Sequence, residues 1–242
     1  MSASATSRRP SSLARLTGLA YLGIIVTGIF AEFVVRGSLV VEDDAIETAR
    51  NIADSPGLFG IGIGADVVMI ALDVTVAIGL FRLLAHVNRR LALTTTVLRL
   101  LQGLVLTFNL LNLYWALGFA RDAVGADGAV LPGAAQDALD AVENHALGYD
   151  TGLIAFGLSC LALGRILLTS GLVSRVLAIG MSVTGVVYLA GSLAAWFAPD
   201  LSTVIEPLYV IPLVVETAFA VRLVTRGLGT TSPDTTRPAP AG

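Results

Sequence analysis

The sequence predicts an all-α fold: a polytopic integral membrane protein built as a bundle of six transmembrane helices, with both termini in the cytoplasm. One observation behind this prediction is composition. Of 242 residues, 55% are hydrophobic and only 14% are charged, and the mean hydropathy is +0.81, whereas an ordinary soluble domain carries about 25% charged residues. Another is a series of six apolar runs of about 20 residues or more, the length that crosses a bilayer. The third is the distribution of the arginines along the chain.

The first predicted helix covers residues 13–35 and follows a small, polar segment, residues 1–12, which we expect to be a disordered cytoplasmic tail. Its apolar run is too long for the core of a signal peptide, which extends over about 7–15 residues. Near its outer end, Glu32 and Arg36 are spaced i,i+4 and are expected to form a local ion pair. Residues 37–56 are acidic and are expected to form an outer loop.

Two further predicted helices, residues 57–84 and 91–119, are separated only by a short arginine-rich turn. Since a short connection makes consecutive helices antiparallel neighbours, we expect them to form a hairpin. Tyr114 and Trp115 lie near the outer end of the second helix, as is typical of the aromatic belt where membrane helices meet water.

The longest connection follows, and its residues 134–146 have the spacing of an amphipathic helix. Its polar positions are Asp137, Asp140, Glu143 and His145. Carboxylates and imidazoles bind metals, but a single His without a compact repeated spacing does not form a zinc motif. We therefore expect a solvated or interfacial helix face rather than a metal site.

The last three predicted helices cover residues 147–168, 176–197 and 204–224. Pro207 and Pro212 are expected to kink the final helix, which a membrane helix tolerates where neighbouring groups satisfy the freed carbonyls. The transmembrane domain as a whole covers residues 13–226. Residues 227–242 are rich in Thr and Pro and are expected to form a second disordered cytoplasmic tail.

The arginines predict the orientation. All 15 basic side chains are Arg. Eleven lie in, or within a few residues of, the tails and the connections after the second and fourth helices, three lie in or beside the other connections, and Arg99 alone lies deep within an apolar run. Because Lys and Arg concentrate on the cytoplasmic side, both termini are expected inside and the acidic loops outside. The predicted location is the inner or plasma membrane.

Several motifs distributed along the chain carry a family resemblance. They are Ala14-Arg15-Leu16-Thr17-Gly18-Leu19-Ala20-Tyr21-Leu22, Leu72-Asp73, Leu80-Phe81-Arg82-Leu83-Leu84, Leu98-Arg99-Leu100, Gly164-Arg165-Ile166-Leu167, Ser170-Gly171, and Glu216 with Leu223 and Gly227. With these motifs the chain resembles a bacterial family of six-helix membrane proteins known only as domain of unknown function 4386. Arg222 departs from the pattern, which has an aromatic or aliphatic residue there. The resemblance implies a topology and no activity.

Polar residues inside the apolar runs form a candidate buried core: Asp66, Asp73, Arg99, Gln102, Asn109 and Glu216. Asp73, Arg99 and Glu216 each lie roughly eight to eleven residues, about 12–16 Å, from the inner end of their helix. These charges are therefore expected at one level, where they must face protein rather than lipid. Asp66 and Asn109 form a second level further out.

Three classes of function fit this core. In the structural class, Arg99 neutralises Asp73 or Glu216 and locks helices together, in a structural or accessory membrane component. In the second class, the remaining carboxylate binds a proton, cation or solute, as in a small solute or proton-coupled carrier. In the third, an intramembrane enzyme uses paired carboxylates among Asp66, Asp73 and Glu216. We expect the lipid bilayer as partner, no nucleic acid, and no cofactor, metal or catalytic motif.

Overall fold

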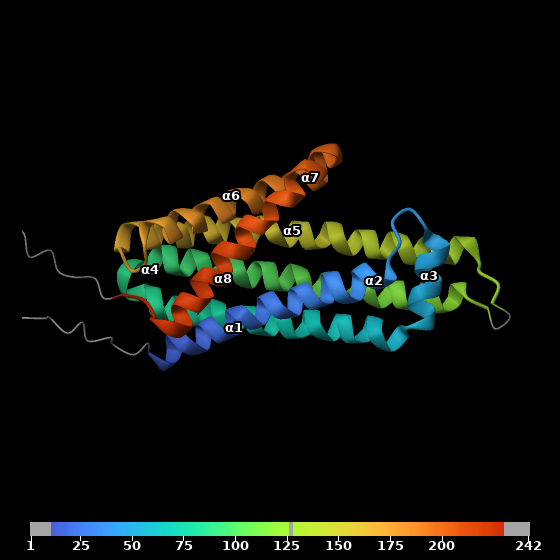
Figure 1. The fold of residues 1–242 in the computed structure, drawn as a ribbon, viewed down its shortest axis with the longest axis horizontal. Coiled ribbons are helices and arrows are strands. Elements are labelled where there is room, and N and C mark those ends of the chain that lie inside the picture. Colours follow the sequence, from blue (N-terminus) through green and yellow to red (C-terminus); the bar gives the residue numbers. More distant parts are fainter. Residues whose placement is uncertain (1–10, 126–127, 230–242) are drawn as a thin grey trace, which may run out of the picture.

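The computed structural model describes residues 11–125 and 128–229, and these form an elongated bundle of helices (Figure 1). The first helical unit runs without interruption through α1 (Ser12–Ile29), the π-helix η1 (Phe30–Arg36) and α2 (Gly37–Leu39). Ser11 caps α1, because its hydroxyl accepts a hydrogen bond from the amide of Ala14 at 3.2 Å. In η1 the backbone bonds skip five residues instead of four, as in the bond from Gly37 N–H to the Glu32 carbonyl.

The next element, α3 (Ala45–Asp54), corrects the sequence prediction, which placed an irregular loop over residues 37–56. Asp44 caps this helix by accepting a hydrogen bond from Glu47 N–H at 2.9 Å. Thr48, Ala49 and Ile52 are buried, because α3 packs against α4 and α5. The acidic residues face outward, and the cap followed by Glu three residues later was the overlooked helix signal.

The longest element, α4 (Pro56–Ala123), is a hairpin of two helical arms. The chain reverses at Asn88, whose φ of −150° and ψ of 95° are not helical. The Asn88 side chain accepts a hydrogen bond from Leu91 N–H at 3.1 Å and so caps the second arm. The two arms lie antiparallel (Figure 1) and cover the ranges predicted as two helices.

The fifth helix, α5 (Pro132–Ser170), is continuous where the sequence analysis placed two helices, 134–146 and 147–168. It ends at Gly171, whose φ of +66° is the left-handed conformation that favours glycine after a helix. On its outer half the face formed by Ala135, Ala138 and Val142 is buried. This stretch is therefore part of the bundle and not a separate surface helix.

The chain ends with α6 (Arg175–Phe197), α7 (Pro199–Ile205), the 3-10 turn η2 (Glu206–Tyr209) and α8 (Val210–Thr225). The single helix predicted over residues 204–224 is thus wrong at its start, where Pro207 lies in the 3-10 turn. Pro212 does lie within α8. The predicted tails, residues 1–12 and 227–242, fall largely outside the described residues.

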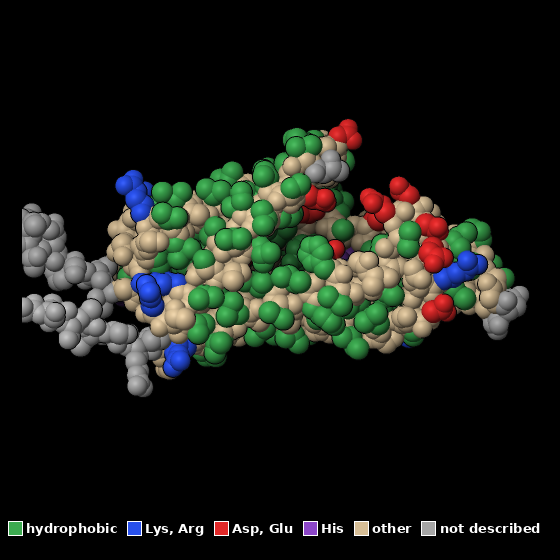
Figure 2. Space-filling model, viewed as in Figure 1, with side chains coloured by type: hydrophobic (Ala, Val, Ile, Leu, Met, Phe, Trp, Pro, Cys, Tyr) green, Lys and Arg blue, Asp and Glu red, His purple; other side chains and the backbone are tan. Residues whose placement is uncertain are grey.

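Five helical segments of the described chain are long and apolar enough to cross a membrane, with the whole of α4 counted as one. Their outward faces carry exposed large apolar side chains, among them Phe33 (74%), Val176 (82%) and Phe197 (81%). Tyr114 and Trp115 are also exposed. Figure 2 shows basic side chains gathered at the end that holds the α4 reversal, and acidic ones toward the opposite end.

Close approach of backbones fixes the contact between α5 and α6. A Cβ added to Gly157 would lie 2.9 Å from the Gly185 carbonyl oxygen, and one added to Gly185 would lie 2.6 Å from that of Gly157. At Gly133, also in α5, an added Cβ would meet no atom within 4 Å.

We predict that Gly157→Ala destabilises the protein by roughly 1–3 kcal/mol, because the added methyl overpacks a backbone contact. Gly133→Ala is the matched control and should leave stability unchanged or slightly raised. Unfolding followed by circular dichroism in detergent measures both. Equal effects of the two substitutions would show that α5 and α6 do not pack this closely.

Candidate functional site

The centre of the bundle holds a buried ion pair between the two arms of α4. Arg99 Nη2 binds Asp73 Oδ1, and both side chains are buried. The sequence analysis left the partner of Arg99 open between Asp73 and Glu216, and the structure shows that it is Asp73. The pair joins the two arms at one level, as the similar distances of Asp73 and Arg99 from the inner ends of their helices predicted.

Two aromatic rings from other helices enclose the same guanidinium. Arg99 Cζ lies 5.1 Å from the ring centroid of Tyr21 in α1 and 4.7 Å from that of Phe156 in α5. A cation placed over aromatic faces is stabilised by the ring quadrupoles, and more so when it is desolvated. Arg99 therefore connects α1, α4 and α5 with a single side chain.

Several polar atoms around Arg99 have no hydrogen-bond partner in the described structure. They are Arg99 Nε and Nη1, Thr95 Oγ1 and Gln102 Oε1. Thr95 and Gln102 lie one helical turn on either side of Arg99 and share its face of α4. Because nearly all buried polar groups in proteins are hydrogen-bonded, this level of the core retains unused donors and acceptors.

Glu216 in α8 lies in the same centre but is held differently. Its Oε2 accepts a hydrogen bond from Tyr21 at 3.0 Å, and its Oε1 accepts one from Tyr188 of α6 at 2.8 Å. Among the described residues no basic side chain lies within ion-pair distance of Glu216; Arg99 acts on it only at longer range. The centre thus contains two carboxyl groups and one guanidinium.

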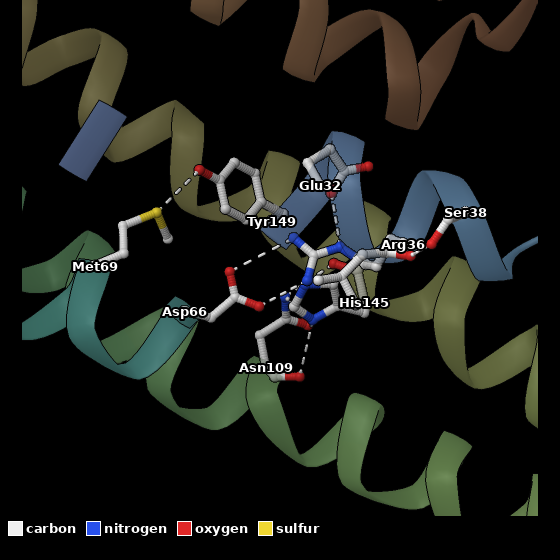
Figure 3. A network of polar contacts seen from close by, with 9 residues as sticks. Glu32, Arg36, Ser38, Asp66, Met69, Asn109, His145 and Tyr149 are labelled. Atoms are coloured by element: carbon white, nitrogen blue, oxygen red, sulfur yellow. Dashed lines mark hydrogen bonds and ion pairs between the residues drawn. The ribbon is translucent and has the colours of Figure 1, made fainter. Parts of the chain in front are cut away.

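A second buried cluster lies further along the bundle, around Arg36 (Figure 3). Arg36 Nη1 binds Asp66 Oδ2 at 2.7 Å, and Arg36 Nε binds Glu32 Oε2 at 2.7 Å. The predicted pair of Glu32 and Arg36 is confirmed, but Arg36 is only 7% exposed and not a loop residue, so Arg99 is not the only buried arginine. Asp66 has a full partner here that the sequence analysis did not identify.

Asn109 and His145 complete this second cluster. Asn109 Nδ2 donates to the His145 carbonyl oxygen at 2.8 Å and lies 3.1 Å from His145 Nδ1. Gly148 makes this approach possible, because a Cβ there would lie 2.0 Å from Asn109 Oδ1. His145 is 4% exposed, and its Nε2 has no hydrogen-bond partner among the described residues. The prediction of a solvated face is therefore wrong for His145, although Asp137, Asp140 and Glu143 are exposed.

The two clusters are separated by about two turns of α4, roughly 10 Å between Asp66 and Asp73. The space beside the second cluster is lined by Asp66, Met69, Ile70, Leu106, Leu110, His145 and Tyr149, and is too narrow for a water molecule. Tyr149 donates to Met69 Sδ at 3.8 Å and lies within electrostatic range of both Asp66 and Glu216. The described residues contain no group of three or more His, Cys, Asp or Glu placed to hold a metal.

Three residues of these clusters were missed from the sequence, although each carried a signal. Tyr21 and Tyr188 are phenols in the middle of apolar runs, away from the interfacial belt, where a buried hydroxyl requires a partner. His145 is an isolated polar residue in the middle of a helix face whose other members are apolar. Residues of this kind identify a buried centre even when their partners are distant in sequence.

The comparisons with known proteins agree with the resemblance noted above. The family model described as Domain of unknown function (DUF4386) matches residues 16–227. The chain belongs to this family. No match was found among curated proteins, and none among solved structures.

We predict that Arg99→Gln lowers the free energy of unfolding by roughly 3–5 kcal/mol, because it leaves Asp73 as an uncompensated buried charge. In a double-mutant cycle Asp73→Asn should be strongly non-additive with Arg99→Gln, and Glu216→Gln should be much closer to additive. Denaturation in mixed micelles provides the values. Stronger coupling to Glu216 than to Asp73 would contradict the pairing.

For the second cluster, Arg36→Gln should destabilise far more than Glu32→Gln. The Glu32 side chain is 60% exposed, so its loss should cost less than about 1 kcal/mol, whereas Asp66 is buried and would lose its partner. Thermal unfolding of both variants and of Arg36→Gln/Asp66→Asn tests this ranking. Recovery of stability in the double variant is expected, since no charge is then left alone.

Proposed function

We propose that the chain is a six-span integral membrane protein with both termini in the cytoplasm. The proposal counts the two arms of α4 as separate spans, because each is long enough to cross a bilayer. The three other long helical units and the η2–α8 unit supply the remaining four. The orientation rests on the eleven arginines in or near the tails and inner connections against three in or near the outer ones.

Its role in this proposal is that of a structural or accessory component of the membrane. The observation that carries it is the Arg99 centre, which joins helices through an ion pair with Asp73 and ring contacts with Tyr21 and Phe156. Polar contacts between buried helices hold a bundle together where lipid supplies no hydrophobic drive for association. The Arg36–Asp66 pair ties η1 to α4 in the same way.

A second candidate function, a proton-coupled carrier, is favoured by Glu216. Two carboxyl groups and one guanidinium leave this centre with one negative charge in excess, and Glu216 is the group without an ion pair. The buried surroundings of Glu216 favour the smallest ligand, a proton. An enzyme using paired carboxylates gains no support, because Asp66 and Asp73 are each bound to a different arginine.

The topology is tested with single cysteines in a Cys160→Ala background. Cysteines at Glu42 and Asp137 should react with an impermeant thiol reagent on intact cells, because these exposed residues lie in the outer regions. A cysteine at Arg89 should react only after permeabilisation. Labelling of the Arg89 position from outside would reverse the orientation.

Infrared difference spectroscopy on reconstituted protein separates the two candidate roles. In a carrier, a protonated-carboxyl band should appear between about pH 8 and about pH 5 and be absent from Glu216→Gln. Glu143→Gln, which removes an exposed carboxyl group of α5, is the matched control and should retain the band. If no Glu216-dependent band forms, the carrier candidate fails and the structural role stands.

A further inference from the structure

We propose that Glu216 exchanges protons with the outer side of the protein along a relay of hydroxyl groups, Tyr188, Ser192 and Tyr209, whose outer mouth is formed by Asp150 and Glu206. The ligand of this site is the proton itself. The proposal rests on the carrier candidate above and adds the route and the side of access.

The inner end of the relay is the hydrogen bond from Tyr188 to Glu216 at 2.8 Å. Tyr21 also donates to Glu216, but its ring lies beneath Arg99 and edge-on to Phe219 at 6.1 Å, so no further hydroxyl follows it. A guanidinium carries donors and no acceptor. Arg99 therefore cannot pass a proton on. Further hydroxyl groups lie beyond Tyr188 and not beyond Tyr21.

The middle of the relay lies on α6, where Ser192 follows Tyr188 by four residues and thus shares its face about 6 Å further along the helix. Ser192 is fully buried and lies within interaction range of Asp150 and Tyr209. Its Oγ makes no hydrogen bond of normal geometry with any described residue. The rings of Tyr188 and Tyr209 are 5.7 Å apart. The Tyr209 hydroxyl lies against the backbone of Gly191, since a Cβ added there would be 2.2 Å from it.

The outer mouth combines carboxylates from two elements. Asp150 of α5 and Glu206 of η2 act on each other and on Tyr209. Neither takes part in an ion pair found in the described part of the chain. Figure 2 shows acidic side chains around a hollow between the α7 end and the rest of the bundle. A concave acidic surface concentrates cations from water, protons included.

The charged and titratable groups that face Glu216 come from four elements. They are Tyr21 of α1, Asp73 and Arg99 of α4, Tyr149 and Cys160 of α5, and Tyr188 of α6. Arg99 favours the ionised form of Glu216 and Asp73 opposes it, and the two are bound to each other. The effects of Arg99 and Asp73 on Glu216 oppose each other, and the direct contacts of the carboxylate are the tyrosine hydroxyls.

The step transfers one proton and no electrons. A carboxylic acid at the mouth gives its proton to the hydroxyl above it, and each hydroxyl oxygen gains one proton as it releases another inward. Tyr188 gives its proton to Glu216 Oε1 and regains one from the outer neighbour. At the end Glu216 is neutral, the mouth carboxylate is ionised, and every hydroxyl is restored.

The test follows the Glu216 carboxyl band in time after a rapid change from about pH 8 to about pH 5, by infrared spectroscopy on reconstituted protein. Tyr209→Phe/Ser192→Ala should slow the appearance of the band roughly tenfold or more, since removing hydrogen-bonded steps raises the barrier. Asp150→Asn/Glu206→Gln changes only the mouth and should also slow it. Tyr114→Phe, an exposed tyrosine on α4, is the matched control and should not.

The outcomes separate the relay from the function on which it rests. A Glu216 band that appears at the wild-type rate in both double variants overturns the relay and leaves the carrier candidate standing. Absence of the band from the wild type overturns both. If the core double variant does not fold, the mouth variant decides, because its side chains lie at the rim of the helix packing.

Discussion

Burial of a permanent positive charge is the constraint on which the bundle depends. Arg99 is the largest fully buried side chain in the described structure, and an unpaired ion in such surroundings costs several kcal/mol. The compensation comes from separate helices: Asp73 by charge, Tyr21 and Phe156 by their ring faces. Since these partners meet only in the assembled bundle, the guanidinium stabilises this arrangement of helices over other packings of the same apolar segments.

The charges of the two buried arginines, Arg36 and Arg99, are compensated in different ways. Arg36 is bound on two edges by carboxylates, and one of them, Glu32, lies at the surface of the bundle with a side chain that is 60% exposed. Arg99 is enclosed by aromatic rings, and two of its nitrogens, Nε and Nη1, have no hydrogen-bond partner among the described residues. Tyr149 lies within electrostatic range of a carboxylate of each centre, Asp66 and Glu216.

The positions of the long helices and the level of the central charges could be predicted from the sequence, because a helix that crosses a bilayer has a narrow range of lengths and directions. The level of Asp73 opposite Arg99 followed from counting residues along two antiparallel helices. Arg36 was misassigned because an arginine near a helix end normally faces water, and nothing local indicates that Asp66, thirty residues later, lies beside it. The helix α3 was missed because its acidic composition was taken to indicate a loop, despite the capping residue Asp44. The sequence could not decide whether Asp73 or Glu216 pairs with Arg99, because that depends on the direction of each side chain.

The π-helix η1 determines which way the end of the first span faces. Each residue of an α-helix turns the chain by about 100°, and a π segment contains one residue more than the regular helix needs. Arg36 closes that segment, so its direction depends on this additional residue. In a chain one residue shorter here, the Arg36 side chain would be rotated by about 100° around the helix axis, away from its present direction toward Asp66. The length of the segment is thus as much a part of the ion pair as the two side chains that form it.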